Sequence, residues 1–150
     1  MIKIKEFQGE YRWLSNFWRT DIVFKGKTFP TLEHAYQSCK CNSKLDIKKI
    51  LQCKTPGEAK RLGRRIEFSP FHWEKVKIKV MKDLLTIKFS DPLLRRKLLS
   101  TGEILLEEGN YWGDTFWGID LKSGRGKNVL GRLLMEIREE LRNESKEKVS

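Results

Sequence analysis

The sequence has 150 residues, a length that fits one domain with a core large enough to need no disulfide or metal for its stability. It lacks the run of roughly 20 apolar residues that crosses a membrane, and its N-terminus lacks the apolar core of a secretion signal, so we expect a cytoplasmic protein without a membrane partner. The 31 Lys and Arg residues outnumber the 20 Asp and Glu residues and give a formal net charge of +11. This charge favours a partner that carries phosphate, whether a nucleic acid, a nucleotide or a sugar phosphate.

Strand patterns lie near the N-terminus. Residues 1–7 alternate apolar and basic side chains, as an edge strand does, and residues 21–29 indicate a strand, a turn at Gly26 and a short returning strand. Helical patterns fill most of the remaining chain. The sequence therefore predicts a mainly helical α+β fold with a small N-terminal sheet.

The first predicted helices begin at capping residues. Thr31 precedes a helix from Leu32 to about Cys41, and a capping box that starts at Thr55 precedes one that ends near Arg65. Residues 72–89 repeat apolar side chains every three or four positions and predict a long amphipathic helix, with the Lys side chains mostly outside its apolar face. The members of that face are Trp73, Val76, Val80, Leu84 and Ile87.

The last third of the chain contains one segment without a pattern. Asp91 begins a further predicted helix that Gly102 ends, and residues 103–108 follow as a strand. Residues 109–127 fit neither a helical nor a strand period, and long ordered loops of this kind are often functional. Residues 128–142 predict the last helix, with its leucine and isoleucine residues on one apolar, core-facing side, and a frayed polar tail over 143–150. We expect residues 1–150 to form a single domain.

The chain offers few ligands for a metal ion. Its three cysteines, Cys39, Cys41 and Cys53, form no CxxC pair, and only His34 and His72 accompany them. We expect three reduced structural thiols, no metal site, no cofactor and no obligate protein partner.

The segment PTLEHAYQSCK places an acid, an amide and an amine on one helical stripe. Glu33, Gln37 and Lys40 share a face because positions i, i+4 and i+7 do. Such a stripe is either an exposed, solubilising surface or one wall of an active site. Ser15 and Asn16 favour the second interpretation, because they are polar residues among aromatic ones, and such a mixture suits a flat ligand with hydrogen-bonding edges.

The patternless loop repeats this mixture. Trp112 and Asp114 lie in NYWGDTFWG, which combines aromatic rings with one acid and glycines. Lys127 and Asn128 lie in SGRGKN at the start of the last predicted helix, where backbone N–H groups suit a phosphate, although the segment matches neither a Walker loop nor GxGxxG. Arg64 in LGRR is a second candidate for a phosphate contact.

These segments, in this order, resemble the YbiA/NADAR family. The resemblance rests on FQGEYRWLSNF, GKTFPTLEHAYQSCK, TPGEAKRLGR, Trp73, the pair Lys88 and Phe89, YWGD and GKNVLGRLLMEIR, and it covers about residues 7–138. It implies a compact, mainly helical α+β domain whose site gathers the SNF, EHxxQ and WGD segments. Members of the family are N-glycosidases that cleave a ribosyl C1–N bond, either in the ribosylamino phosphate intermediates of riboflavin synthesis or between ADP-ribose and guanine.

The resemblance and the chemistry of this reaction give the candidate residues their roles. Glu33 is expected to stabilise positive charge at C1, and Asp114 to orient water or the leaving group. Lys40 is expected either to bind phosphate or to attack the opened ribosylamine and form an imine, with the electrostatic role preferred. The expected substrate contacts come from Ser15, Asn16, Gln37, Arg64, Trp112, Lys127 and Asn128.

Three functions stay open at this point. The preferred one is hydrolysis of ribosylaminopyrimidine phosphates, with a small ribosyl phosphate as partner. The second is removal of ADP-ribose from guanine in nucleic acid, and the third is a non-catalytic module that binds ADP-ribose or nucleic acid. The two acids favour catalysis, because a simple anion-binding groove has no need of them. The scatter of basic residues over several helices favours a small substrate over a nucleic acid.

Overall fold

The computed structural model describes residues 2–149, which divide into two compact units. Unit 1 consists of the chain up to Ser15 and from Phe89 onward, and unit 2 of Asn16–Lys88. The fold is α+β and mainly helical, with three small two-stranded sheets among the described residues, which confirms the predicted class. The organisation of residues 1–150 as a single domain stays a prediction.

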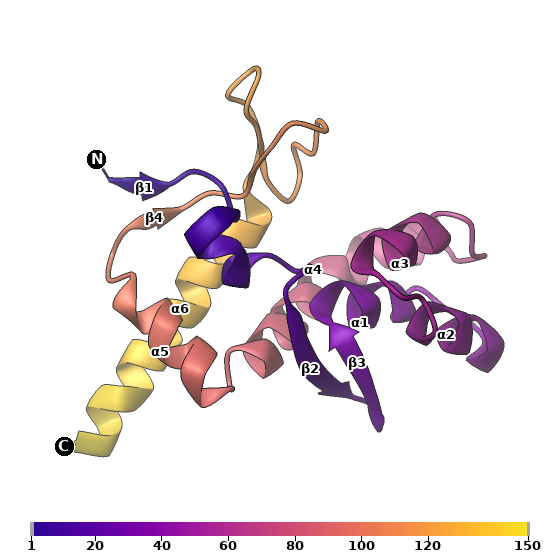
Figure 1. Ribbon diagram of the computed structural model, residues 1–150, viewed down its shortest axis with the longest axis horizontal. Coiled ribbons are helices and arrows are strands. Elements are labelled where there is room, and N and C mark those ends of the chain that lie inside the picture. The colour runs from indigo at the N-terminus through magenta and orange to yellow at the C-terminus, as the bar shows by residue number, and fades with distance from the viewer. Residues whose placement is uncertain (1, 150) are drawn as a thin grey trace. The chain divides into compact units, whose positions relative to one another are not determined.

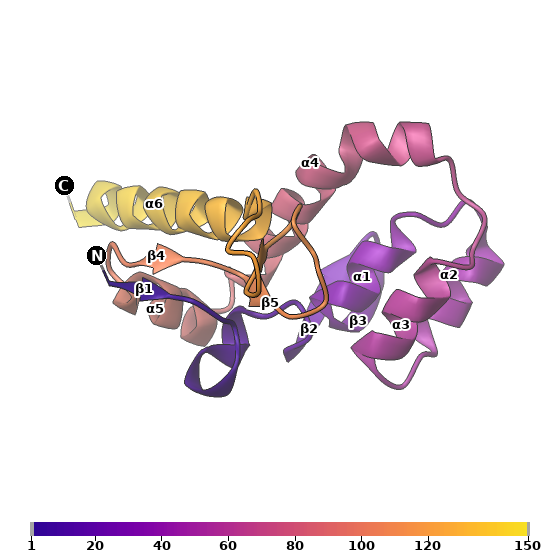
Figure 2. The same cartoon turned by 90° about the horizontal axis from the view of Figure 1, so that it is seen from above.

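Unit 1 pairs the N-terminus with a segment from the last third of the chain. Strand β1 (Lys3–Ile4) lies parallel to β4 (Leu105–Leu106), as Figures 1 and 2 show. Helix α5 (Pro92–Ser100) packs on α6 (Val129–Val149), which also contacts β4. The predicted apolar face of the last helix is confirmed, because Leu130, Leu133, Leu134, Ile137 and Leu141 are all buried.

Helix α6 is longer than predicted. It continues to Val149, beyond the expected end near Arg142, so residues 143–149 belong to the helix, while Ser150 lies outside the described residues. The reason lies in contacts with α5, which the sequence pattern does not reveal. Arg95 of α5 lies 3.4 Å from the Glu144 carboxylate and donates to the Ser145 hydroxyl at 3.3 Å.

Unit 2 begins with a β-hairpin. Strands β2 (Arg19–Phe24) and β3 (Lys27–Thr31) are antiparallel, and Lys25 and Gly26 between them both have positive φ angles, 49° and 77°, as a tight two-residue hairpin turn requires. The predicted turn at Gly26 is therefore confirmed. Thr31 then caps α1 (Leu32–Ser38) by accepting a hydrogen bond from the His34 N–H at 3.1 Å.

Three further helices surround α1, and all seven of its residues are buried. They are α2 (Lys44–Leu51), α3 (Pro56–Gly63) and α4 (Pro70–Lys88). Helix α2 was not predicted, and Ile50 is its only buried residue. Ile47, Ile50 and Leu51 share a helical face, so their spacing was a signal that the sequence analysis missed. Its N-terminus nevertheless carries a capping residue, since the Ser43 hydroxyl accepts from the Asp46 N–H at 3.1 Å.

Helix α4 has a more polar buried face than its sequence predicts. Trp73 and Leu84 are buried as expected, and Met81 and Leu85 are buried beside them. Lys88 is buried as well, with 2% of its surface exposed, so it is an exception to the expectation that the Lys side chains lie mostly outside the apolar face. Residues i, i+3, i+4 and i+7 share a helical face, and Lys88 is seven positions after Met81.

No helix in residues 2–149 has the length and apolar character needed to cross a membrane.

Replacing Lys88 by Met is expected to change how the stability of the fold depends on pH. Burial lowers the pKa of the Lys88 ammonium from 10.5 to about 7, so between these values a proton binds the unfolded chain but not the folded one. The contribution of neutral Lys88 to stability is therefore complete above pH 10.5 and is lost as the pH falls towards 7. Relative to Lys88→Met, we expect the free energy of unfolding of the wild-type protein to rise by about 1.4 kcal/mol per pH unit between pH 7.5 and 9.5.

Urea unfolding at several pH values from 7 to 9.5 measures this effect. The wild-type protein should gain stability relative to Lys88→Met as the pH rises. Lys75→Met is the matched control, because Lys75 lies on the same helix with an exposed side chain. Equal pH dependence in wild type and Lys88→Met would contradict the prediction.

Candidate active site

The start of α1 brings a catalytic candidate beside the SNF segment. The backbone N–H of Glu33 donates to the carbonyl of Asn16 at 3.1 Å, because the first N–H groups of a helix have no partner within the helix. Both residues belong to unit 2. Asn16 and the Glu33 stripe therefore lie together, as the sequence suggests.

The stripe on α1 is buried rather than exposed at two of its three positions. Glu33 and Gln37 are 7% and 3% exposed, and Lys40 is half-buried just after the helix. The Gln37 amide donates from Nε2 to Oε1 of Glu33 at 2.8 Å. A solubilising surface stripe would be in water, so this geometry removes that alternative.

Burial and nearby cations act on Glu33 in opposite directions. Loss of water raises the pKa of its carboxyl above 4.5, while the Gln37 hydrogen bond and the charges of Lys60, Lys40 and Arg64 lower it. The pKa of Lys40 is lowered by burial and by its cationic neighbours Arg64 and Lys60, while the Glu33 charge raises it. Perturbed groups of opposite charge in one place are typical of active sites.

Aromatic rings form a second wall beside Lys40. Its Nζ lies 5.2 Å from the centre of the Phe68 ring and 5.9 Å from the Trp73 ring, within the range of cation–π attraction. The Trp73 ring in turn lies 5.1 Å from that of Tyr36. Burial and the Glu33 charge both raise the pKa of Tyr36, which keeps its hydroxyl neutral. Lys40 is thus held between a carboxylate and a cluster of rings.

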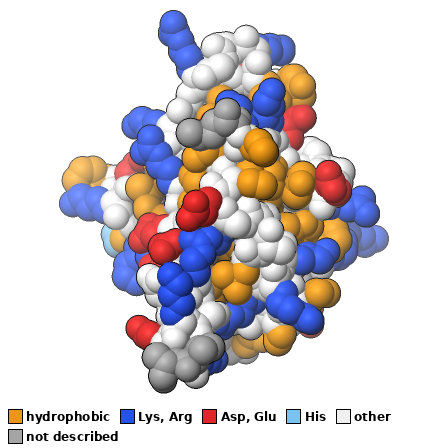
Figure 3. All heavy atoms as spheres, turned by 90° about the vertical axis from the view of Figure 1, so that its left-hand side faces the viewer, with side chains coloured by type: hydrophobic (Ala, Val, Ile, Leu, Met, Phe, Trp, Pro, Cys, Tyr) orange, Lys and Arg blue, Asp and Glu red, His pale blue; other side chains and the backbone are white. Residues whose placement is uncertain are grey.

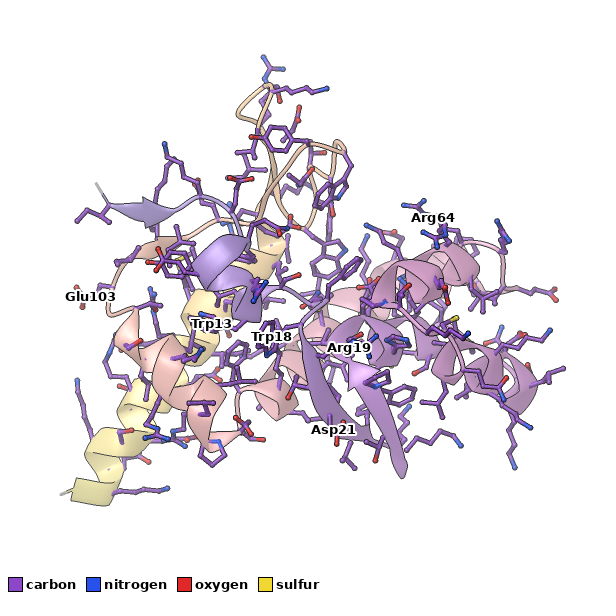
Figure 4. All side chains as sticks on the ribbon, in the orientation of Figure 1. Trp13, Trp18, Arg19, Asp21, Arg64 and Glu103 are labelled. Atoms are coloured by element: carbon purple, nitrogen blue, oxygen red, sulfur yellow. The ribbon has the colours of Figure 1, made fainter. Side chains whose placement is uncertain are left out.

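Helix α3 supplies the cations opposite α1. Arg64 is the residue that ends this helix, with an exposed side chain, and Figure 4 shows it extending from α3. Lys60 precedes it by four positions and therefore shares its helical face. The sequence analysis missed Lys60, although its spacing from Arg64 was a signal that pointed to it. Three cations around one carboxylate leave this region with an excess of positive charge, which suits a phosphorylated ligand.

Two amide oxygens in unit 2 are buried without a hydrogen-bond partner. They are Oδ1 of Asn16 and Oε1 of Gln37. The Asn16 amide nitrogen contacts only a weak acceptor, the sulfur of Met81 at 3.5 Å. A buried acceptor without a donor costs about 1–3 kcal/mol, so these two amides are not explained by stability.

His34 and the cysteines have structural environments. The His34 ring lies 2.7 Å from the Thr31 hydroxyl and 2.9 Å from the Cys53 carbonyl, and burial lowers its pKa, so it stays neutral. Burial raises the pKa of the Cys39 thiol, and that of Cys41 to about 11. A protonated thiol is a poor nucleophile, so these two cysteines show none of the activation typical of redox-sensitive thiols. Within residues 2–149, no three His, Cys, Asp or Glu side chains are placed to hold a metal ion.

The remaining candidates lie in unit 1, mostly in the loop of residues 109–127. Short strands β5 (Gly109–Asn110) and β6 (Ile119–Asp120) pair in parallel within it, which the sequence did not predict. Asp114 accepts the backbone N–H groups of Phe116 and Trp117 on its Oδ1, at 3.0 and 2.9 Å. Its carboxylate therefore has a structural task, while its expected role on water stays a prediction. Trp112 is 58% exposed, and Ser15 follows the short helix η1 (Gly9–Leu14).

Asn128 joins the loop to the body of unit 1. Its φ is 51°, a left-handed conformation, and its amide donates to the Leu106 carbonyl at 2.9 Å and accepts from the Glu108 N–H at 3.0 Å. Both ends of the amide are thus used by the backbone. Lys127 next to it is exposed, with Nζ 5.7 Å from the Phe116 ring.

The start of α6 does not offer the phosphate cradle that SGRGKN suggested. The N–H groups of Val129 and Leu130 donate to the carbonyls of Phe116 and Trp117, at 3.1 and 3.0 Å. The loop itself therefore occupies the donors that a phosphate would need. Sequence spacing places a basic segment before a helix but does not show which groups fold back onto its N-terminus.

The chain is similar to proteins of known type over almost its whole length. Residues 4–142 match the model of the NADAR domain. The N-glycosidase YbiA of Escherichia coli (strain K12) is 40% identical over 143 residues, which are 94% of this chain and 88% of that protein. An NMR structure of the E. coli protein YbiA matches with a TM-score of 0.84 and 37% identity, over 97% of this chain and 87% of the other.

A longer relative shares only the region that this chain covers. The riboflavin biosynthesis protein VVA0006 of Vibrio vulnificus (strain YJ016) is 36% identical over 130 residues. These are 85% of this chain but 35% of the relative, so this chain spans about a third of that protein.

Two substitutions at Asp114 separate its structural task from a chemical one. Asp114→Ala removes the acceptor of two backbone N–H groups and should destabilise unit 1 by about 1–3 kcal/mol. Asp114→Asn keeps an oxygen at the acceptor position. We therefore expect faster amide hydrogen exchange at Phe116 and Trp117 in Asp114→Ala, and exchange close to wild type in Asp114→Asn. Equal exchange in all three proteins would contradict the structural task. Loss of turnover in a well-ordered Asp114→Asn would support the role on water.

Proposed function

The chain belongs to the NADAR domain family, and from this premise we propose that it hydrolyses the ribosyl C1–N bond of ribosylaminopyrimidine phosphates, intermediates of riboflavin biosynthesis, with Glu33 as the central catalytic residue. At the level of the bond, the chain is a hydrolase that acts on N-glycosyl bonds. The pyrimidine substrate is the proposal, supported by the name of the Vibrio relative. The main observation behind it is the buried Glu33 carboxylate, which accepts a hydrogen bond from Gln37 and interacts with the charges of three cations.

The chemistry asks for a negative charge beside the sugar. As the C1–N bond breaks, positive charge develops at C1, water adds there, and the leaving nitrogen takes a proton. An ionised Glu33 stabilises that charge, and its partial removal from water strengthens the attraction. Gln37 and the three cations favour the ionised form, while burial raises the proton affinity of the same group, which suits it to accept a proton from the attacking water.

Lys40, Lys60 and Arg64 suit the phosphate of this substrate. Their charges all act on Glu33, so they lie near its carboxylate. We assign Lys40 the electrostatic role, because its ammonium lies over two rings that attract a cation. The imine route is the alternative for Lys40, since burial lowers its pKa and thereby raises the fraction of neutral amine.

The distribution of basic residues supports a small substrate. On the face of the molecule in Figure 3, Lys and Arg side chains are scattered among hydrophobic and acidic ones and form no continuous stripe. Binding along a nucleic-acid backbone uses a continuous basic patch or stripe. A riboside phosphate needs only the few cations beside Glu33.

Mass spectrometry of parallel reactions tests the substrate. The protein is incubated with a ribosylaminopyrimidine phosphate and, separately, with DNA that carries ADP-ribosylated guanine, both with EDTA present. We expect release of ribose phosphate from the first substrate. Turnover should fall at least about 100-fold in Glu33→Gln, while this variant should unfold under the same conditions as the wild-type protein. Cleavage of the DNA substrate alone would move the proposal to ADP-ribosyl glycosidase, and cleavage of neither would favour a binding module. A folded Glu33→Gln with wild-type turnover would exclude the role of Glu33.

Borohydride reduction tests the two roles of Lys40. With the electrostatic role, substrate plus sodium borohydride should leave the mass of the protein unchanged. Lys40→Arg, which keeps the charge but cannot form an imine, should then retain more turnover than Lys40→Met, although the two cations differ in geometry. A reduced sugar adduct on Lys40, together with equal loss of turnover in Lys40→Arg and Lys40→Met, would establish the imine route.

A further inference from the structure

Gly63 occupies a position where α3 approaches α1 too closely for any side chain. A Cβ atom built on Gly63 would lie 1.9 Å from Oε1 of Gln37 and 2.6 Å from its Cδ. The Gln37 amide therefore fills the space that a side chain on α3 would take. Gly63 is buried within α3 and does not have a positive φ angle, which would favour glycine on its own. The need for glycine at this position therefore comes from the space that Gln37 occupies.

The Gln37 amide has one productive contact and one unsatisfied atom. Nε2 donates to Oε1 of Glu33 at 2.8 Å, while Oε1 is buried without a partner. An apolar side chain of similar size would leave no unsatisfied oxygen. The amide therefore has one stabilising contact, the hydrogen bond to Glu33, and this contact offsets the cost of its unsatisfied oxygen.

We propose that Gln37 is a positioning residue that fixes the Glu33 carboxylate, and that Gly63 holds the Gln37 amide in the orientation that donates to it. This differs from the substrate contact expected for Gln37 from the sequence. The inference rests on the proposed catalytic role of Glu33 and adds to it. Gln37 and Gly63 touch no reacting atom in this account, and they act through Glu33 alone.

The arrangement also sets how readily Glu33 binds a proton. Four described groups interact electrostatically with Glu33. Tyr36 lies on α1 and Lys40 just after it, while Lys60 lies on α3 and Arg64 caps its C-terminus. Gln37 adds the hydrogen bond that favours the ionised form. When that bond is lost, burial acts with less opposition and the pKa of Glu33 rises. Turnover that needs ionised Glu33 then declines at a higher pH than in the wild-type enzyme.

Three variants test the inference. Gln37→Met keeps the approximate size of the side chain and removes the donor, and Gly63→Ala forces the Gln37 amide to move. Gly57→Ala is the matched control on the same helix, because a Cβ there would meet its nearest atom, Nη1 of Arg61, at 3.5 Å, an ordinary contact. The readouts are the titration of the Glu33 carboxyl carbon by NMR, the pH profiles of kcat and KM, and urea unfolding.

We expect Gln37→Met and Gly63→Ala to raise the pKa of Glu33 and to move the acid limb of kcat to higher pH. Near neutral pH, kcat should fall about 10-fold, the factor that corresponds to ~1.4 kcal/mol of transition-state stabilisation, with KM little changed. Gly57→Ala should match wild type in both profiles. Gly57→Ala should unfold at urea concentrations close to wild type or higher, since Ala favours helix over Gly. Gly63→Ala and Gln37→Met should stay folded but unfold at somewhat lower urea concentrations, because the first crowds the buried Gln37 amide and the second removes the donor to Glu33.

The outcomes separate this inference from the proposed function. An unchanged Glu33 titration in both variants would overturn the inference, whatever the enzyme cleaves. A shift in Gln37→Met but not in Gly63→Ala would overturn the role of Gly63. If no riboside is cleaved, the NMR titration still tests the positioning, and the failure then belongs to the proposed function.

Discussion

Complete burial of α1 is the constraint on which the rest of unit 2 depends. Strands β2 and β3 and helices α2, α3 and α4 all contact this seven-residue helix, so its polar side chains have little access to water. Each must find a partner within the protein. His34 uses Thr31 and the Cys53 carbonyl, and the Ser38 hydroxyl donates to the Ala35 carbonyl at 2.6 Å. Glu33 and Gln37 use one another, and among the buried side chains of α1 only Oε1 of Gln37 stays unsatisfied. Buried polar atoms are generally hydrogen-bonded, and the exception on α1, Oε1 of Gln37, lies in the candidate site.

Local signals were sufficient to predict the starts of three helices, α1, α3 and α5. Thr31, Thr55 and Asp91 each accept a backbone N–H in the first turn of the helix that follows, as their sequence context predicts. The hairpin turn at Gly26 and the buried face of α6 are of the same kind, since each depends on residues near one another in the sequence. The length of α6, the burial of Lys88 and the approach of Gly63 to Gln37 depend on partners from other segments. No local pattern contains that information.

The candidate site follows the same division. The stripe of Glu33, Gln37 and Lys40 was predictable from helical spacing, and its place beside Asn16 is confirmed by a backbone hydrogen bond. Its burial was not predictable, because an acid in a first helical turn is usually exposed. In the loop of unit 1, residue type suggested ligand contacts for Asp114 and Asn128, yet both side chains bind backbone groups. Asp and Asn serve loops and ligands with the same atoms, so composition alone does not separate the two uses.

The electrostatics of the stripe link substrate binding to proton affinity. Burial raises the pKa of Glu33, and Lys60, Lys40 and Arg64 lower it, so the ionised carboxylate depends on cations that the phosphate of the proposed substrate would also attract. A bound phosphate offsets part of their positive charge and thereby raises the proton affinity of Glu33. The Gln37 hydrogen bond is the one contribution to the ionised form that phosphate leaves in place. With the proposed substrate bound, a fixed neutral donor would keep Glu33 ionised while the phosphate weakens the effect of the cations, and this accounts for an amide at this buried position despite its unsatisfied oxygen.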